Sequence, residues 1–218
     1  MTDATVILLA KAPVPGRVKT RLCPPCSFDQ AAVIARAAIV DSIAAITATP
    51  GIRPLVVLDG APGPWLPSGV DVVAQVDGDL AARLTGAFAA VDGPTVLLGM
   101  DTPQVTTAQL RHAVDTLLDP GTDAVLGPTV DGGFWIIGLR APDDRAFTGI
   151  PMSVDTTGAA QHHRLTTLGF TTRTLTTEID VDTFADARAV AAVAPHTTFA
   201  AAVARVERAL LLPTGVPS

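Results

Sequence analysis

Short apolar segments without polar alternation recur along this chain, and a helical pattern follows most of them. In Val6–Leu9 and Val96–Leu98 every residue is apolar. Strands of this kind are expected where helices cover both faces of a sheet, because both faces of each strand are then buried. The strands predicted in this way are Thr5–Ala10, Pro54–Leu58, Val70–Gln75, Thr95–Met100, Asp123–Leu126 and Phe134–Gly138.

Helical patterns fill the segments between these strands. Ser27 and Gln30 have the spacing of a capping box and predict a helix that runs to about Thr47. The other predicted helices are Asp79–Val91, Thr107–Leu118, Val154–Leu168, one that starts at Asp182 or Thr183, and Thr198–Leu212, whose apolar face indicates a packing helix. Alternation of strand and helix predicts an α/β fold, a mostly parallel, doubly wound sheet with helices on both faces.

Length and composition set limits on the class of protein. The 218 residues fit one domain, predicted over 1–212 with a loose tail at 213–218. No stretch has eighteen consecutive apolar residues, and the run Val6–Ala10 is too short for a signal-peptide core, so we expect a cytoplasmic protein without a membrane span. The net charge of −6 argues against nucleic acid as a partner, while an oligomer stays open.

A basic loop, residues 11–22, follows the first predicted strand. In open α/β sheets ligands bind beyond the carboxyl ends of the strands, which is where this loop lies. Gly16 allows it to turn sharply, and it contains four cations and no acid over eleven residues: Lys11, Arg17, Lys19 and Arg21. A diphosphate or triphosphate would relieve their mutual repulsion, so the loop predicts phosphate binding. The alternative is a solvated basic loop.

Asp101 comes directly after the fourth predicted strand and is followed by Pro103, which restricts the turn. Carboxylate oxygen is the usual ligand of Mg²⁺ or Mn²⁺, which also bind substrate phosphates. A helix cap or a salt bridge is the alternative, although Thr106 and Thr107 are nearer caps for the next helix.

Two further segments carry carboxylates. The paired glycines Gly132 and Gly133 permit close backbone approach to a ligand, and Asp131 before them could hydrogen-bond a sugar hydroxyl or an acceptor hydroxyl; the alternative is a β-turn that enters a hairpin. Asp180 and Asp182 alternate along an extended segment and so point the same way, which indicates shared metal ligation or a helix cap.

Cys23 and Cys26 form a lone C-x-x-C pair. Zinc would need two further ligands at suitable spacing, and the sequence offers none. A redox pair is one interpretation, and two small residues that close a loop is the one we favour.

Taken together, these segments resemble a bacterial family of GT-A-type, nucleotide-diphospho-sugar transferase-like proteins that largely lack assigned substrates. The basic loop and the Asp-x-Asp-Thr segment are also similar to guanylyltransferases of deazaflavin cofactor synthesis. The matching residues are Lys11-Ala12-Pro13, Pro15 to Leu22, Gln75, Gly78-Asp79-Leu80, Arg83-Leu84, Gly99, Asp101-Thr102-Pro103, Gly127-Pro128, Asp131 to Trp135 and Asp180 to Thr183.

The chain departs from the family pattern in two places. Ala81 stands where the family usually has glycine, and Met152-Ser153-Val154 stands where it often has Trp-Ser-Thr, in a region expected near the acceptor. The resemblance implies a Rossmann-like GT-A fold and binding of a nucleotide with a metal more firmly than it implies which bond is broken.

The resulting hypothesis is a metal-dependent transferase that uses a nucleotide sugar or a nucleoside triphosphate with a small-molecule acceptor. Asp101, with Asp182 or Asp180, would hold Mg²⁺ or Mn²⁺, the four cations would neutralise the leaving phosphate, and Asp131 would orient or deprotonate the acceptor. Arg83 would reach the nucleotide or pair with Asp79. Nucleotidyl transfer to a small phosphorylated acceptor, and nucleotide binding without turnover, are the alternatives to glycosyl transfer.

Overall fold

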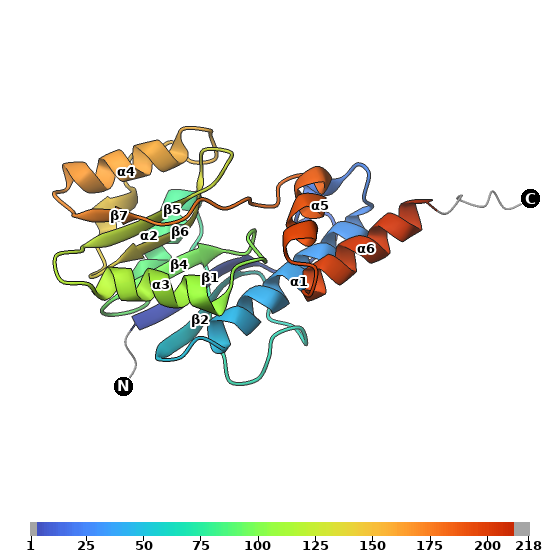
Figure 1. The fold of residues 1–218 in the computed structure, drawn as a ribbon, viewed down its shortest axis with the longest axis horizontal. Coiled ribbons are helices and arrows are strands. Elements are labelled where there is room, and N and C mark those ends of the chain that lie inside the picture. The colour runs from blue at the N-terminus through green and yellow to red at the C-terminus, as the bar shows by residue number, and fades with distance from the viewer. Residues whose placement is uncertain (1–3, 212–218) are drawn as a thin grey trace, which may run out of the picture.

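The computed structural model describes residues 4–211, and its centre is a seven-stranded sheet in the order β3-β2-β1-β4-β6-β5-β7. Figure 1 shows this sheet with helices packed on both sides. The strands are β1 (Ala4–Lys11), β2 (Ile52–Asp59), β3 (Asp71–Ala74), β4 (Thr95–Gly99), β5 (Ala124–Pro128), β6 (Phe134–Leu139) and β7 (Thr172–Thr174). The predicted α/β fold with a mostly parallel sheet is confirmed.

One strand, β6, runs antiparallel to both of its neighbours, β4 and β5. The short turn at 129–133 joins β5 to β6, and a connection of that length allows only an antiparallel pairing. The other pairings are parallel. The sequence pattern does not predict strand β7, because its Thr-Arg-Thr sequence lies at the sheet edge and carries no apolar pattern.

The central strands of the sheet are buried on both faces, as their apolar runs predicted, whereas the edge strand β3 is exposed along its length. Neighbouring residues of β1 point to opposite sides, so that Leu8 packs in the cluster with α1 (Phe28–Thr47) and α3 (Thr107–Leu118). Ile7 packs on the other side with α2 (Leu80–Ala89) and α4 (Thr157–Thr167). The short 3₁₀ helix η2 (Asp144–Phe147) packs in this second layer, whereas η1 (Thr20–Leu22) buries Leu22 in a separate cluster.

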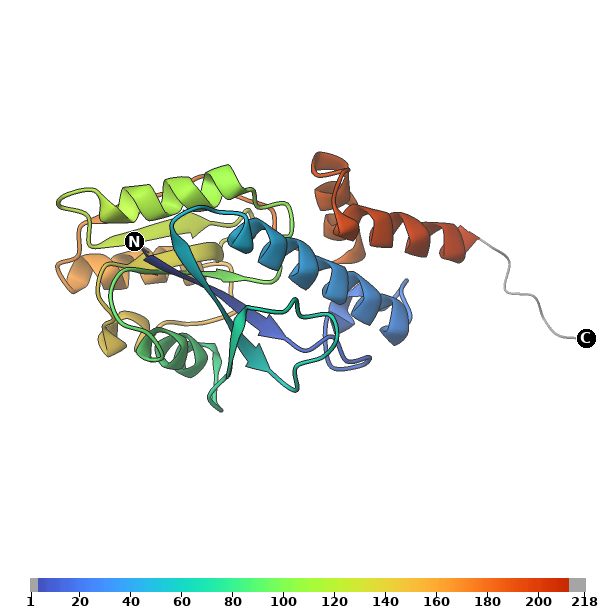
Figure 2. The same ribbon diagram turned by 90° about the horizontal axis from the view of Figure 1, so that it is seen from below.

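A third apolar cluster lies away from the sheet, where α5 (Phe184–Val193) and α6 (Thr198–Leu211) pack on α1. Figure 1 and Figure 2 both show these helices at one end of the molecule. Phe199, Val203 and Val206 are buried there, while Leu210, predicted for the same face, is 39% exposed. Leu212 and the tail 213–218 lie outside the described residues.

Helix α1 is long and apolar enough to cross a membrane by length and composition alone. More than half of that stretch, 56%, is buried inside the protein, where it contacts both β1 and α6. The helix therefore acts as a core element in this fold.

Side-chain caps decide where the helices begin. The predicted capping box of α1 is present, with the Gln30 backbone N–H donating to Ser27 Oγ at 3.2 Å. Thr183 caps α5, so of the two predicted starts it is the one used, and Asp182 is left free of a capping role. Helix α4 begins at Thr157, later than the predicted Val154, because the Thr157 hydroxyl donates to the Val154 carbonyl and holds residues 154–156 in a turn.

The turn between β5 and β6 packs directly on the start of α4. Gly132 has φ +91°, and a Cβ there would lie 1.8 Å from the Asp155 carbonyl oxygen. The Gly158 N–H donates to the Gly132 carbonyl at 2.8 Å, and a Cβ on Gly158 would lie 2.5 Å from the Gly133 carbonyl oxygen. The glycines thus permit close backbone approach, and the partner they approach is the chain itself.

Replacing Gly132 by alanine is expected to destabilise the protein by clearly more than the cost of a left-handed backbone, roughly 1–2 kcal/mol, because the new Cβ also displaces Asp155. Gly149→Ala is the matched control, since Gly149 has φ +74° and a Cβ added there would meet nothing within 4 Å. Urea unfolding of both variants measures the difference. Equal losses of unfolding free energy would show that the contact with Asp155 contributes nothing.

Candidate functional site

The site is assembled by one extended segment, residues 178–182, which crosses the carboxyl ends of β4 and β5. The Glu178 N–H donates to the Pro128 carbonyl at 3.1 Å, and the Val130 N–H donates to the Glu178 carbonyl at 3.0 Å. At its other end the Val181 N–H donates to the Asp101 carbonyl at 2.8 Å. This crossing segment brings carboxylates that are distant in sequence to one edge of the sheet.

Three carboxylates form an acidic cluster: Asp131, Asp180 and Asp182 each offer an oxygen within 4.8 Å of the others. Burial, followed by the neighbouring charge of Asp131, raises the pKa of Asp180 to about 6, with smaller contributions from Asp182 and Asp101. A hydrogen bond from the backbone opposes the shift. The negative charges therefore repel one another here, and a cation would relieve that repulsion.

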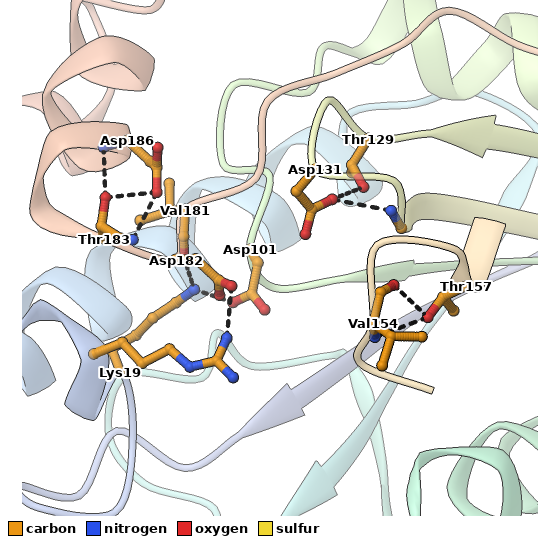
Figure 3. A network of polar contacts seen from close by, with 12 residues as sticks. Lys19, Asp101, Thr129, Asp131, Val154, Thr157, Val181, Asp182, Thr183 and Asp186 are labelled. Atoms are coloured by element: carbon orange, nitrogen blue, oxygen red, sulfur yellow. Dashed lines mark hydrogen bonds and ion pairs between the residues drawn. The ribbon is translucent and has the colours of Figure 1, made fainter. Parts of the chain in front are cut away.

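Asp101 lies beside the acidic cluster and pairs with Lys19, whose Nζ is 2.7 Å from Asp101 Oδ1 (Figure 3). Lys19 also donates to the Val181 carbonyl, and only 8% of its side chain is exposed. Asp101 was predicted to bind a metal, to cap a helix or to form a salt bridge, and the structure shows the salt bridge. The role of Asp101 as a metal ligand stays a prediction. Asp180 and Asp182, its predicted partners in metal binding, lie beside Asp131 in the acidic cluster.

The cations of the basic loop are largely paired with the protein's own acids. Lys11 lies 3.5 Å from Asp59, and Arg21 lies 2.7 Å from Asp182. Arg17 is exposed, and no ion pair to it occurs among residues 4–211. The loop turns at Gly16, with φ +74°, as predicted.

Two cavities meet at this site. A basic cavity of about 260 Å³ is lined by all four cations of the loop. A larger cavity of about 340 Å³ contains the acidic cluster together with residues 153–155. Both cavities share Arg21, Met100, Asp101 and Asp182, so these residues form the boundary between the basic cavity and the acidic cluster.

Asp131 is fixed by its own turn. Its Oδ1 accepts a hydrogen bond from the Gly133 N–H at 3.0 Å and another from the Thr129 hydroxyl. Figure 3 shows the other oxygen directed away from the turn, on the side where Asp101 lies. This segment therefore forms the predicted β-turn, and the same turn leaves one Asp131 oxygen available to the site.

Asp79 and Arg83 lie outside both cavities. Asp79 caps α2 by accepting the Ala82 N–H at 2.9 Å. Arg83 pairs with Asp59 at 3.3 Å instead of with Asp79, and its Nε donates to the Gly78 carbonyl. Their predicted contact with the nucleotide stays a prediction.

Sequence reasoning missed three residues that support the site: Gln104, Gln109 and Glu178. Gln104 donates to the Ile179 carbonyl at 2.6 Å and to Glu178 at 3.3 Å, and Gln109 also donates to Glu178. These contacts tie the start of α3 to the crossing segment. The only sequence signal was the Thr106–Gln109 capping-box spacing, which predicts a helix start and says nothing of Glu178.

The surroundings of the two cysteines disfavour the thiolate form. Both are free thiols, and Cys26 is buried. Burial, together with the neighbouring Cys23, raises the pKa of Cys26 to about 11. Since the thiolate is the reactive form, this environment favours the loop-closing interpretation.

The raised pKa of Asp180 predicts how stability depends on pH. Folded protein holds this proton more tightly than unfolded protein, so the contribution of Asp180 to stability falls as pH rises from about 4 through about 6. In chelator, Asp180→Asn should therefore gain thermal stability relative to the parent protein at pH 7.5 but not at pH 4. The exposed Asp92→Asn is the control. A gain that is the same at both pH values would contradict the assignment.

Solved structures share this fold. A protein from Desulfovibrio desulfuricans G20, for which a nucleotide-diphospho-sugar transferase activity has been suggested, is 24% identical with a TM-score of 0.84, over 96% of this chain and 97% of that one. CMP:2-keto-3-deoxy-manno-octonic acid synthetase, solved with CTP, is 14% identical with a TM-score of 0.58, over 88% and 98%. Glucosyl-3-phosphoglycerate synthase from Mycobacterium tuberculosis, solved with Mn²⁺ and UDP, is 13% identical with a TM-score of 0.51, over 82% and 71%.

No curated protein matches the sequence. The family described as "Uncharacterized protein conserved in bacteria" (DUF2064) matches residues 35–154, which is more than half of the chain. The matched range includes β4 with Asp101 and the turn with Asp131. The chain therefore belongs to this bacterial family and has the Rossmann-like fold shared by nucleotide-diphospho-sugar transferases and nucleotidyltransferases.

Proposed function

We propose that this protein is a divalent-metal-dependent transferase that uses a nucleotide sugar or a nucleoside triphosphate, most in keeping with a GT-A glycosyltransferase. The observation that carries the proposal is the boundary at Asp101 and Asp182, where a cavity lined by four cations meets a cavity that contains three clustered carboxylates. Phosphates suit the first cavity and a metal ion suits the second. A nucleotide phosphate bridging them satisfies both sets of charges.

The residues of the acidic cluster fit a hard divalent cation. Asp180 and Asp182, with Asp101 beside them, would supply carboxylate oxygens only, which is the donor set that Mg²⁺ and Mn²⁺ prefer, and Asp131 at the edge of the same cluster would serve the acceptor. The raised pKa of Asp180 reflects in part the repulsion that such an ion would remove. When bound there, a divalent cation neutralises charge on the leaving phosphate.

The protein's own residues bind and orient the substrates. Arg17, Lys11, Lys19 and Arg21 face the basic cavity and offer charge-assisted hydrogen bonds to phosphate oxygens. Lys19 and Arg21 now pair with Asp101 and Asp182, so phosphate binding would exchange one anionic partner for another. Asp131, rigid in its turn, holds the acceptor oxygen and takes its proton where that oxygen is a hydroxyl.

Two chemistries fit this arrangement. In glycosyl transfer the acceptor oxygen bonds to the anomeric carbon, the bond from that carbon to phosphate breaks, and a nucleoside diphosphate leaves with the electron pair. In nucleotidyl transfer the acceptor oxygen bonds to the α-phosphorus, and pyrophosphate leaves. The fold supports either, because relatives in structure include both a synthetase solved with CTP and a synthase solved with UDP.

Metal binding is expected to depend on the acidic cluster. Asp180→Asn and Asp182→Asn should each weaken Mn²⁺ binding by about tenfold or more, since each removes a charged ligand. Titration calorimetry measures the affinity, and Asp92→Asn, an exposed residue away from the site, should bind like the parent. Parent-like Mn²⁺ affinity in both cluster variants would remove the metal site. Asp101→Ala separately tests the predicted metal-dependent binding of nucleotide.

The products of turnover distinguish the candidate functions. Incubation with Mn²⁺ and a panel of sugar nucleotides and nucleoside triphosphates should release a nucleoside diphosphate, which identifies glycosyl transfer, or pyrophosphate, which identifies nucleotidyl transfer. Chelator should abolish either release. Tight nucleotide binding without release across a broad acceptor panel would instead support a nucleotide-binding protein without turnover, the alternative suggested by Ala81 and residues 152–154.

A further inference from the structure

The larger cavity has a second, apolar wall that the proposed chemistry does not use. The same cavity that contains the carboxylates is lined by aliphatic and aromatic side chains of the core cluster under α2: Leu9, Leu80, Leu84, Leu97 and Phe134. Leu84 and Leu97 form a buried floor, only 2% and 3% exposed, whereas Leu9, Leu80 and Phe134 are half-buried around it. The apolar layer of the sheet thus stays open to the cavity at the carboxyl ends of its strands.

The rim of this wall is built by residues 152–155. Met152 packs on the same apolar cluster, and Val154 lines the cavity while 45% of it stays exposed. The Thr157 hydroxyl holds the rim: it accepts the Val154 N–H and lies 2.8 Å and 2.7 Å from the Pro151 and Val154 carbonyl oxygens, which share its one proton, as Figure 3 shows for Val154. Ser153 takes a left-handed backbone, φ +62°, to make this turn.

Two further apolar side chains pack on the core cluster to which Leu84 and Leu97 belong. Ala81 packs on the apolar cluster beside Leu80, and Met152 packs on it from the rim. The apolar surroundings of the cavity therefore extend beyond the five side chains that line it.

The chemistry of the wall disfavours contact with the polar edge of a nucleobase. Bases are told apart by hydrogen bonds, and none of the five side chains of the wall carries a donor or an acceptor. A buried base edge would leave its polar groups unpaired against Leu80 or Phe134, which is costly. An apolar segment would lose nothing there and would gain burial.

We propose that the apolar wall receives an apolar segment of the acceptor, so that the second substrate is a small amphiphile with its reacting oxygen at Asp131 and several carbons against Leu80, Leu84 and Phe134. The inference rests on the proposed function, because the carboxylates must hold the reacting end. Its distinctive consequence is a dependence of affinity on apolar chain length.

Straight-chain alkyl phosphates, from methyl to hexyl, test this with a constant headgroup. In the Mn²⁺-loaded protein each added methylene should tighten binding, by up to about fourfold where it is fully buried, until the cavity is filled. Titration calorimetry measures the series, and inorganic phosphate serves as the probe of the charged half of the site. If inorganic phosphate does not bind, the proposed function is overturned and this inference with it.

Variants of the wall locate the effect. Phe134→Ser and Leu80→Ser should flatten the chain-length series and leave the affinity for inorganic phosphate unchanged, whereas Val193→Ser, an exposed valine on α5, should keep the parent series. Circular dichroism confirms that each variant is folded, and either wall variant suffices if the other does not fold.

Three results would overturn the inference while phosphate still binds. The series could be flat in the parent protein, or it could persist in a folded wall variant. Adenosine, guanosine, cytidine or uridine, which lack phosphate, could also abolish the chain-length dependence by competition, which would assign the wall to a nucleobase. Absence of competition by all four nucleosides supports the acceptor.

Discussion

The hydrogen bond from the Val181 N–H to the Asp101 carbonyl, with the pairing of Glu178 to the β5–β6 turn, holds the site together. These contacts lay the crossing segment over the ends of β4 and β5. Without them Asp180 and Asp182 would belong to a loop, remote from Asp131. Gln104 and Gln109 add side-chain hydrogen bonds from α3 to the same segment, so the position of the carboxylates is fixed from three sides.

Charge balance is the second constraint on this edge of the sheet. Four carboxylates converge here, and the resulting repulsion contributes to the raised pKa of Asp180. Lys19 and Arg21 offset part of it by pairing with Asp101 and Asp182. The site is thus a set of paired charges, and under the proposed function a metal ion and a phosphate would each replace a partner of like sign.

Much of the fold could be predicted because its causes are local. Unbroken apolar runs such as Val6–Leu9 fixed the buried strands, and the Ser27–Gln30 capping box fixed the start of α1. Prediction failed where tertiary contacts decide: β7 has no apolar pattern of its own, and α4 begins late because Thr157 bonds backward to Val154. The Asp-Gly-Gly turn was recognised, but its contact with Asp155 could not be foreseen from spacing.

The sequence by itself determined the layers of the fold, the basic loop, and the carboxylates at the strand ends, because residue type and periodicity carry that information along the chain. Only the tertiary structure decided which charges meet. It placed Asp131 with Asp180 and Asp182, paired Asp101 with Lys19, and turned Arg83 toward Asp59. The physical reason is that these contacts join residues tens of positions or more apart, whose approach depends on how the strands are ordered and not on their local sequence.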